Sequence, residues 1–415
     1  MSTGIHRCLR IALLTISALL LAVCPLHLAA TESSTRVERV LYTFTGGADG
    51  FDPQDGVIFD DAGNIYGTTK QGGAYGFGVV FKLTSDASHA WTQTVLHDFA
   101  GGNDGMNPEA RLVFDSAGNL YGTTYGGGTG AAGTVFKLSP DGSGGWTYSV
   151  FFSFPSATES GFGPKAGLIL DQNGNLYGTT NLGGLLRQPC GTVGCGVVFM
   201  LDSAGNETVL HQFQGGSDGA FPPGGLTFDA AGNLYGMTNR GGICEFDGGC
   251  GTIFKLSPAG NGQWTESIIH TFGAILDGGY PESDVSFDAA GNMYGTTSSA
   301  IFKLAPNDDG TWSETILHTF SYGNGGLHPN SVLLTAGGIL YGTTFLGESP
   351  FAGSVFKMKP DETGNWVLKT LYSFTGQRDG AFVVTGLVAR DGRLYGATSG
   401  GGTKKNTGVI FEVKP

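Results

Sequence analysis

The segment Asn119-Leu120-Tyr121-Gly122-Thr123-Thr124 recurs six more times along the chain with small changes, and this repetition limits the folds that the sequence can adopt. The spacings between the successive tyrosines are 55, 56, 58, 59, 47 and 54 residues. A period of this size is typical of solenoids and propellers. We therefore expect one domain of seven units, although a length of 415 residues would otherwise suggest two or three domains. The copies are centred on Tyr66, Tyr121, Tyr177, Tyr235, Tyr294, Tyr341 and Tyr395.

Each unit contains four strand signals in a fixed order, which we label a to d. In the second unit they are Leu112–Asp115, Asn119–Thr124, Gly133–Leu138 and Trp146–Phe154. Each segment is short, rich in β-branched and aromatic residues and bounded by Gly, Asp, Asn or Pro, as expected for strands. The 73 glycines suit the many turns that such an all-β chain requires.

The turn between strands a and b has the pattern Asp-x-x-Gly-Asn in five units. This is hairpin chemistry, because the glycine supplies a left-handed conformation and the aspartate accepts hydrogen bonds from turn amides. We therefore interpret these aspartates as turn caps rather than ligands. They are Asp60, Asp115, Asp171, Asp229 and Asp288.

The two ends of the repeat array complement each other. The first repeat segment, Val40–Phe44, is a d strand, whereas the last, Val409–Val413, is a c strand whose unit lacks a d strand of its own. Pairing these ends would complete the last unit and remove an exposed sheet edge. The sequence thus predicts a seven-bladed β-propeller over residues 31–415, with four antiparallel strands per blade and the last blade closed by the N-terminal strand. An open β-solenoid is the alternative.

The units resemble the GloVer tandem repeat of the bacterial choice-of-anchor exported proteins. The patterns GNLYGTT, GTVFKLSP and VLHxFxGGxDG carry this resemblance over nearly all of the chain after residue 30. It implies export and a propeller-like fold, without an established activity. Because the chain stops at Pro415 directly after strand c, we expect no C-terminal anchor. A weaker likeness, limited to the Asp-x-x-Gly-Asn-Leu-Tyr hairpin, is to NHL and gluconolactonase-type propellers.

Residues 1–30 differ from the repeats and have the features of a secretory signal peptide. Arg7 and Arg10 precede an apolar run of residues 11–23, and small residues follow at 28–30. The run is short for a membrane span, so an uncleaved anchor is the weaker alternative. Lipidation of Cys24 is another alternative, disfavoured because Val23 is bulkier than lipoprotein signals prefer. We expect a secreted protein, extracellular or periplasmic.

Acidic residues dominate the charge of the mature chain. The full chain has 22 Lys and Arg against 35 Asp and Glu. Removing Arg7 and Arg10 with the signal leaves 20 minus 35, a charge of −15. Nucleic acid binding depends on basic residues that neutralise phosphates, so we expect no nucleic acid partner. We also expect a monomer without a transmembrane segment.

Four cysteines remain after the signal peptide and form two local pairs, Cys190 with Cys195 and Cys244 with Cys250. Disulfides are the default in exported proteins. A four-cysteine zinc site is the alternative, but these spacings are wider than those of common zinc knuckles. We therefore predict two disulfides.

The loops between strands d and a carry an aspartate followed by glycine in five units. A ring of these carboxylates around a central channel could bind a divalent cation such as calcium, which prefers oxygen ligands. The alternative is that each aspartate only forms an Asx turn, with the glycine at positive φ. The predicted metal ligands are Asp49, Asp104, Asp218, Asp277 and Asp379.

The b-to-c loops of units three and four are long and contain the cysteines. They emerge on the same face as the d-to-a loops, and binding residues concentrate on loops held by a rigid scaffold. Disulfides would limit the freedom of these inserts and hold a recognition surface in shape. The alternative is that they only protect long loops outside the cell. The candidate ligand-binding residues are Arg187, Arg240, Glu245, Phe246 and Asp247.

Four histidines share one position of strand d, where other units have Tyr42, Phe152 and Tyr372. We interpret this set, and the tryptophans that begin strand d, as packing residues rather than as a metal cluster or a carbohydrate platform. The histidines are His97, His211, His270 and His318, and the tryptophans are Trp91, Trp146, Trp264, Trp312 and Trp366.

No Ser-His-Asp order, phosphate loop or zinc-protease signature stands out, so the sequence nominates no catalytic residue. The function predicted best is that of an exported propeller that binds a polysaccharide, protein or small molecule, or acts as a scaffold. The alternative is an extracellular metal-assisted enzyme, a lactonase, polysaccharide lyase or hydrolase, with its site in the central funnel. A purely structural cell-surface protein is the third possibility. Fold alone does not separate them.

Overall fold

The structure, a computed structural model, describes residues 37–415 except 157–159, 187–188, 243, 245–248, 274–276, 322, 349–350 and 385. Residues 37–415 form one compact unit. The predicted signal peptide lies outside the described residues and stays a prediction. Among the residues that are described, no helix has the length and apolarity needed to cross a membrane.

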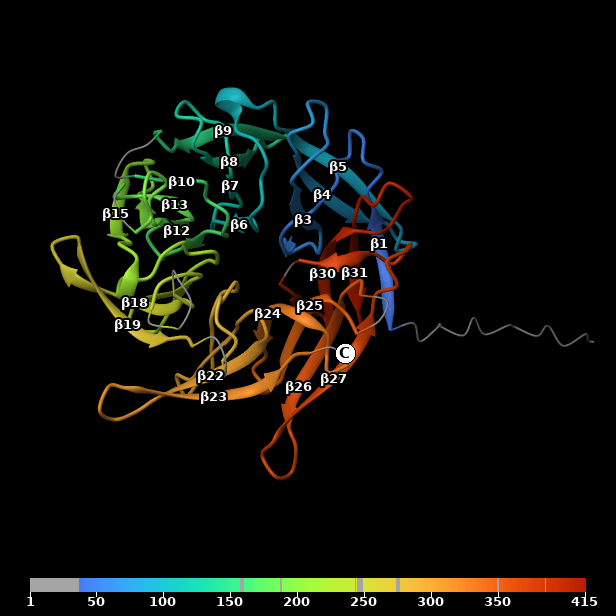
Figure 1. The fold of residues 1–415 in the computed structure, drawn as a ribbon. Coiled ribbons are helices and arrows are strands. Elements are labelled where there is room, and N and C mark those ends of the chain that lie inside the picture. Colours follow the sequence, from blue (N-terminus) through green and yellow to red (C-terminus); the bar gives the residue numbers. More distant parts are fainter. Residues whose placement is uncertain are drawn as a thin grey trace, which may run out of the picture. The chain divides into compact units, whose positions relative to one another are not determined.

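Seven antiparallel sheets form a ring of blades, so the predicted seven-bladed β-propeller is confirmed (Figure 1). In each of blades one to six the four strands pair in chain order, a-b-c-d. Strand a lies nearest the centre of the ring and strand d at its outer edge (Figure 1). Two short 3-10 helices, η1 (Gly102–Asp104) and η2 (Gly216–Asp218), lie in d-to-a loops.

The strand bounds follow the repeat. Blade one is β2 (Ile58–Phe59), β3 (Ile65–Thr69), β4 (Val79–Ser85) and β5 (Trp91–Asp98). Blade two is β6 (Val113–Phe114), β7 (Leu120–Thr124), β8 (Thr134–Pro140) and β9 (Trp146–Ser153). Blade three is β11 (Ile169–Leu170), β12 (Leu176–Thr180), β14 (Val197–Leu201) and β15 (Glu207–Gln212), with β10 (Gly161–Phe162) and β13 (Leu182–Gly183) in its loops. Blade four is β16 (Thr227–Phe228), β17 (Leu234–Thr238), β18 (Thr252–Gly260) and β19 (Gln263–Thr271). Blade five is β20 (Ser286–Phe287), β21 (Met293–Thr296), β22 (Ala300–Pro306) and β23 (Trp312–Thr319). Blade six is β24 (Leu327–Leu334), β25 (Leu340–Leu346), β26 (Ser354–Pro360) and β27 (Trp366–Ser373). Blade seven is β28 (Ala381–Val383), β29 (Val388–Arg390), β30 (Arg393–Gly400), β31 (Val409–Val413) and β1 (Glu38–Thr43).

The N-terminal strand closes the ring, as predicted. β1 pairs antiparallel with β31, from Glu38 opposite Val413 to Thr43 opposite Val409. Strand β31 therefore has a partner on both sides, β30 and β1, and the first and last strands of the described chain belong to one sheet. This pairing removes the free edge that an open array of blades would expose.

Side chains from neighbouring blades form the core. The buried apolar residues of the described chain fall into seven clusters, and each cluster combines two adjacent blades. Between blades three and four, for example, Phe213 packs on Phe254 with ring centroids 5.0 Å apart. Trp264 at the start of strand d packs on Tyr177 of the preceding blade. The predicted packing role of the tryptophans is thus confirmed for this junction, as it is for Trp146, Trp312 and Trp366.

A backbone hydrogen bond also joins neighbouring blades at the loop face. The amide of Tyr280, at the end of a d-to-a loop, donates to the carbonyl of Cys250 in the preceding blade at 2.7 Å. Tyr280 has a φ of 50°, a left-handed conformation that is unusual for a bulky residue. The same bond occurs at six junctions, from Asp52, Asn107, Gly163, Phe221, Tyr280 and Phe382. At these positions the hydrogen bond between blades offsets the strain of the left-handed backbone conformation.

The five predicted turn caps are confirmed. In blade four, Asp229 Oδ1 accepts a hydrogen bond from the Asn233 amide at 2.9 Å, and Oδ2 accepts from Asn233 Nδ2 at 2.7 Å and from the Tyr235 hydroxyl at 3.2 Å. Asn and Tyr of the repeated segment thus bind the aspartate that begins their own turn. The same set of bonds is made by Asp60, Asp115, Asp171 and Asp288.

These bonds predict a pH-dependent stability. Burial raises the pKa of Asp229, but its hydrogen bonds outweigh this effect, so that the pKa lies below the ordinary value of 3.8. A carboxyl with a lowered pKa stabilises the fold above the unfolded-state pKa, and this stabilisation is lost as the pH falls through the folded-state pKa. We expect Asp229→Asn to lower the free energy of unfolding by about 1 kcal/mol at pH 7, allowing for partial exposure.

The measurement is urea unfolding of both proteins at pH 7 and near pH 3. The difference between them should shrink at the lower pH, where the wild-type carboxyl begins to be protonated. Asp308→Asn, which removes an exposed carboxyl in the c-to-d turn of blade five, is the control and should change little. A difference of equal size at both pH values would contradict the interpretation.

Candidate functional site

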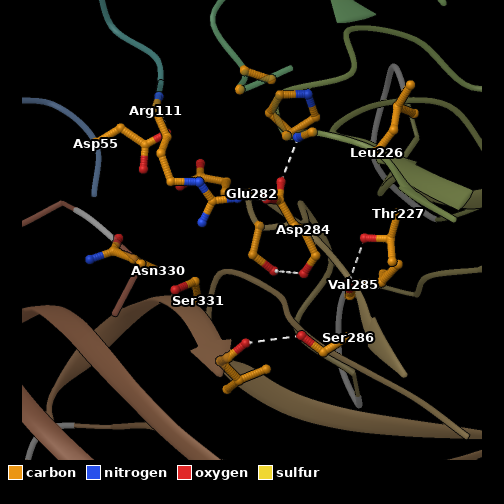
Figure 2. A pocket seen from close by; sticks show the side chains of 18 of the residues that line it. Asp55, Arg111, Leu226, Thr227, Glu282, Asp284, Val285, Ser286, Asn330 and Ser331 are labelled. Carbon is orange, nitrogen blue, oxygen red and sulfur yellow. Dashed lines mark hydrogen bonds and ion pairs between the residues drawn. The ribbon is translucent and has the colours of Figure 1, made fainter. Parts of the chain in front are cut away.

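The chain approaches strand a of every blade through a three-residue segment, and described residues of all seven segments line the centre of the ring. In six blades these residues follow a proline, for example Pro108 before Glu109, Ala110 and Arg111. They contribute to a cavity of about 630 Å³ (Figure 2). Its polar lining includes Gln54, Asp55, Glu109, Arg111, Lys165, Glu282, Asp284, Asn330 and Ser331, and its apolar lining includes Leu226, Phe228, Val285 and Phe287.

Arg111 reaches across this cavity from blade two to blade five. Its Nη2 lies 3.8 Å from Asp284 Oδ2, and the two side chains are 38% and 44% exposed. Figure 2 shows Asp55, Arg111, Glu282 and Asp284 around the same hollow. An ion pair this exposed contributes little to stability, so its groups stay available to a ligand.

The two aspartates beside Arg111 are held in place by backbone amides. Asp55 Oδ2 accepts a hydrogen bond from the Arg111 amide at 2.8 Å, and Asp284 Oδ1 accepts one from the Gly225 amide. Burial raises the pKa of Asp55 above its ordinary value, while the Arg111 guanidinium opposes this shift. Asp55 Oδ1 also accepts from the amide of the adjacent Gly56. Backbone amides of the next blade and of its own segment therefore both position Asp55, while Gly225 of the preceding blade positions Asp284.

The cavity offers donors and acceptors of both signs. Among the described residues that line it there are four carboxylates, Asp55, Glu109, Glu282 and Asp284, and two cations, Arg111 and Lys165. The Glu109 carboxylate also pairs with Lys70 at 2.9 Å. No His or Cys belongs to the described lining. The arrangement suits recognition of a polar ligand by several hydrogen bonds.

The repeat pattern did not predict these residues as a site. The sequence feature that distinguishes them is that the residue type at these positions varies from blade to blade, whereas the turn and packing residues repeat. The first residue of the three is, in blade order, Gln54, Glu109, Lys165, Pro223, Glu282, Asn330 and Val384.

The five aspartates predicted as metal ligands lie elsewhere, at the junctions between blades and away from the central cavity. Each accepts a hydrogen bond from the backbone amide four residues earlier, for example Asp218 from Gln214 at 2.6 Å. This geometry supports the alternative, in which each aspartate forms a turn. Cation binding by the five aspartates as a ring stays a prediction. The equivalent bonds are made by Asp49, Asp104, Asp277 and Asp379.

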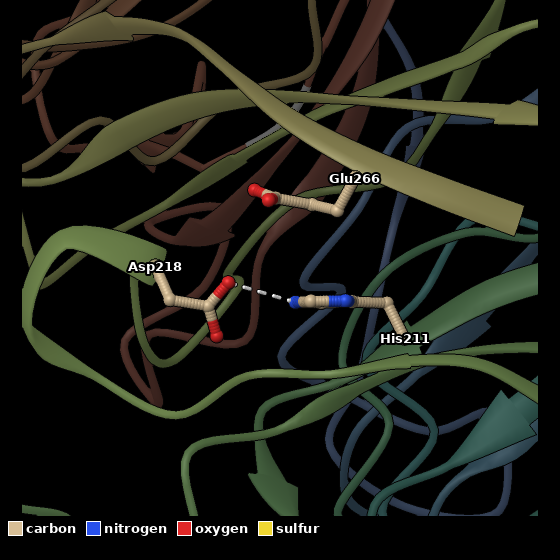
Figure 3. A group of neighbouring side chains, drawn as sticks. All are labelled: His211, Asp218 and Glu266. Carbon is tan, nitrogen blue, oxygen red and sulfur yellow. Dashed lines mark hydrogen bonds and ion pairs between the residues drawn. The ribbon is translucent and has the colours of Figure 1, made fainter.

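Each of these aspartates also faces the aromatic residue of strand d that precedes it. Tyr42 donates to Asp49 at 3.0 Å, and His211 Nε2 lies 3.0 Å from Asp218 Oδ1. The next blade adds a third side chain, the residue two positions after the tryptophan of its strand d. At two junctions this residue is a glutamate, which gives the groups His211, Asp218 and Glu266 (Figure 3) and His270, Asp277 and Glu314.

The histidines were predicted to be packing residues, and His270 does pack on Phe272, with ring centroids 4.8 Å apart. The glutamates were not predicted, because they lie in a different repeat unit from the histidine they meet. A usable signal was the pattern Trp-x-Glu, which occurs at Glu266 and Glu314.

The cysteine pairs form the two predicted disulfides, Cys190–Cys195 and Cys244–Cys250. Of the candidate ligand-binding residues in these loops, Arg240 places its guanidinium 4.8 Å from the centre of the Tyr280 ring. Arg187, Glu245, Phe246 and Asp247 lie outside the described residues, so their role stays a prediction.

A family model describes the repeat. The Gloeobacter/Verrucomicrobia repeat matches residues 30–245, 186–300 and 245–415. The chain belongs to this repeat family. Membership confirms the resemblance that the repeated patterns indicated. No curated protein matches the sequence.

Solved structures with a similar fold come from several functional classes. A catalytically inactive virginiamycin B lyase from Staphylococcus aureus with quinupristin has a TM-score of 0.56 and 13% identity, covering 91% of this chain and 99% of that chain. A proposed 6-phosphogluconolactonase from Bacteroides uniformis has a TM-score of 0.53 and 17% identity, covering 83% and 90%. The extracellular domain of a proposed hybrid two-component system from B. thetaiotaomicron has a TM-score of 0.55 and 12% identity, covering 90% of this chain and 39% of that one. At these identities, the similarity of this chain to the three solved structures shows the fold alone.

The junction between blades three and four predicts a second pH effect. Burial raises the pKa of Glu266 to about 7, His211 opposes this shift and the Asp218 charge adds to it. A carboxyl with a raised folded-state pKa favours the fold at low pH, and this contribution is lost as the pH rises through about 7. We expect metal-free wild-type protein to lose thermal stability between pH 5 and 8 relative to Glu266→Gln.

Glu362→Gln, an exposed carboxyl in the c-to-d turn of blade six, serves as the control. Its melting profile should run parallel to that of the wild type over the same pH range. Parallel profiles for wild type and Glu266→Gln would contradict the predicted titration.

Proposed function

We propose that this protein is an exported binding protein that holds a neutral, hydroxyl-rich ligand, an oligosaccharide, in the central cavity at the loop face. The observation that supports it is the variation of the cavity positions within an otherwise regular repeat. The turn aspartates, the strand-b tyrosines and the strand-d tryptophans recur because each performs the same structural task in every blade that carries it. Where the residue type varies between blades, the position does not perform a structural task that all blades share.

The size and chemistry of the cavity favour this ligand class. A volume of about 630 Å³ lies within the range of small-molecule sites. Sugar hydroxyls both donate and accept hydrogen bonds, so they can use the carboxylates Asp55 and Asp284 as well as the cation Arg111. A polyanion would meet four carboxylates against two cations. The apolar side chains Phe228 and Phe287 offer a surface for the carbon face of a sugar ring.

Several features support an extracellular place of action. The chain contains two disulfides, which persist in oxidising compartments. Residues 1–30 have the pattern of a signal peptide. One of the similar structures is itself an extracellular domain. Secretion and monomeric state are parts of this proposal.

The test is to screen mature protein, residues 31–415, against an array of neutral gluco-, xylo-, manno- and galacto-oligosaccharides, followed by calorimetry with the best ligand. We expect Arg111→Ala to weaken binding about 10- to 100-fold, because a hydrogen bond from a charged donor contributes about 1.5–3 kcal/mol. The exposed Arg378→Ala carries the same charge change on the loop face and should leave affinity unchanged.

Failure to bind any oligosaccharide, or binding unaffected by Arg111→Ala, would contradict the proposal. Cleavage of the bound oligosaccharide during the assay would replace it with the alternative of an extracellular enzyme that uses the same cavity. Chromatography of the ligand after incubation distinguishes these outcomes.

A further inference from the structure

The junction between blades four and five brings together three side chains from separate segments. His270 lies on β19, Asp277 in the following loop and Glu314 on β23 of the next blade. His270 Nε2 is 3.8 Å from Asp277 Oδ2 and 3.4 Å from Glu314 Oε1. One ligand atom from each residue lies within 4.8 Å of the others.

These groups are buried and incompletely satisfied. His270 Nε2, Asp277 Oδ1 and Glu314 Oε1 are buried atoms that make no hydrogen bond with any described residue. Asp277 is only 6% exposed, and its Oδ2 accepts from the Gly273 amide at 2.7 Å. Buried polar atoms without partners are costly, and two of these atoms, His270 Nε2 and Glu314 Oε1, lie 3.4 Å apart beside the Asp277 carboxylate, so the group points to a ligand that its three side chains share.

Two other junctions show how a histidine at this position is placed when it has a hydrogen-bond partner. His211 Nε2 lies 3.0 Å from Asp218 Oδ1, within hydrogen-bonding distance (Figure 3). His97 Nε2 lies 3.1 Å from Asp104 Oδ2, and its ring stacks on Tyr148. At the junction of blades four and five the distance from His270 Nε2 to Asp277 Oδ2 is longer, 3.8 Å, which leaves room for an ion between the groups.

The separations match those around a small tetrahedral cation. An ion with bonds of about 2.1 Å holds its ligand atoms about 3.4 Å apart. The distances of 3.4 and 3.8 Å from His270 Nε2 are close to this value. Three protein ligands leave the fourth position open, as in catalytic zinc sites.

The types of ligand atom in this group indicate which ion it would bind. An imidazole nitrogen suits zinc and similar transition metals, whereas calcium takes six to eight oxygen ligands. Two carboxylates also balance the charge of a divalent ion. The contact of His270 with Phe272 at 4.8 Å fixes the orientation of the imidazole ring. We propose that His270, Asp277 and Glu314 form a binding site for a divalent transition-metal ion, best matched by Zn²⁺.

This site is separate from the central cavity, and its residues do not line it. It differs from the predicted calcium ring in having a nitrogen ligand and in drawing its three ligands from one junction. Of the five predicted aspartates it uses only Asp277. The equivalent group at the junction of blades three and four should bind the ion more weakly, because His211 is already paired with Asp218.

The test is calorimetric titration of tag-free, chelator-treated mature protein with Zn²⁺, and with Co²⁺ to record a tetrahedral absorption spectrum. We expect about one tight equivalent per chain and a Zn²⁺-dependent rise in melting temperature. His270→Ala and Glu314→Gln should each weaken Zn²⁺ binding by at least tenfold, since loss of even an outer-shell partner costs about 10- to 100-fold.

His318→Ala is the matched control. It removes the same strand-d histidine one blade further on, where the next blade has Leu368 in place of the glutamate. Circular dichroism verifies that each variant is folded, and Glu314→Gln preserves side-chain volume. Absence of tight Zn²⁺ binding by the wild type, or tight binding that survives both His270→Ala and Glu314→Gln, would overturn the proposal.

Discussion

Packing between neighbouring blades is the interaction on which the rest of the structure depends. Each blade is a small antiparallel sheet whose buried side chains have no complete core of their own, since all seven core clusters of the described residues combine two blades. A linear array of such units would leave its first and last faces without partners. The pairing of β1 with β31 converts the array into a ring in which every blade has two neighbours (Figure 1).

This constraint separates structural from functional positions. Asp229, Tyr235 and Trp264 belong to positions that recur because every blade must make the same turn and the same interface. The cavity residues, such as Arg111 and Asp284, meet side chains of distant blades, so the requirements of one repeat do not determine them. The junction group of His270 and Glu314 is intermediate, because its positions recur while its residue types change. The regular scaffold therefore carries polar side chains that differ from blade to blade at its centre and at selected junctions.

The sequence predicted the fold well because the determinants of a propeller are local. Asp-x-x-Gly-Asn specifies a hairpin by bonds within five residues, and the missing last d strand specifies closure. The site was predicted less well, because it depends on contacts between units. The loop aspartates were expected around the channel, but Asp218 bonds to the backbone of its own loop and to His211 on the outermost strand. Glu314 meets His270 only through the packing of two blades, and Arg111 meets Asp284 only across the ring.

Native-state hydrogen exchange of β1 tests the central claim, a closed ring that holds its loop face rigid, most directly. The chain is expected to open as a unit, so amides of Val40 and Tyr42 should exchange as slowly as those of Phe411 and Ile410, their partners in β31. Exchange of the β1 amides by rapid local opening, while β30 and β31 remain protected, would contradict the account. It would mean that the ring is not closed by its N-terminal strand.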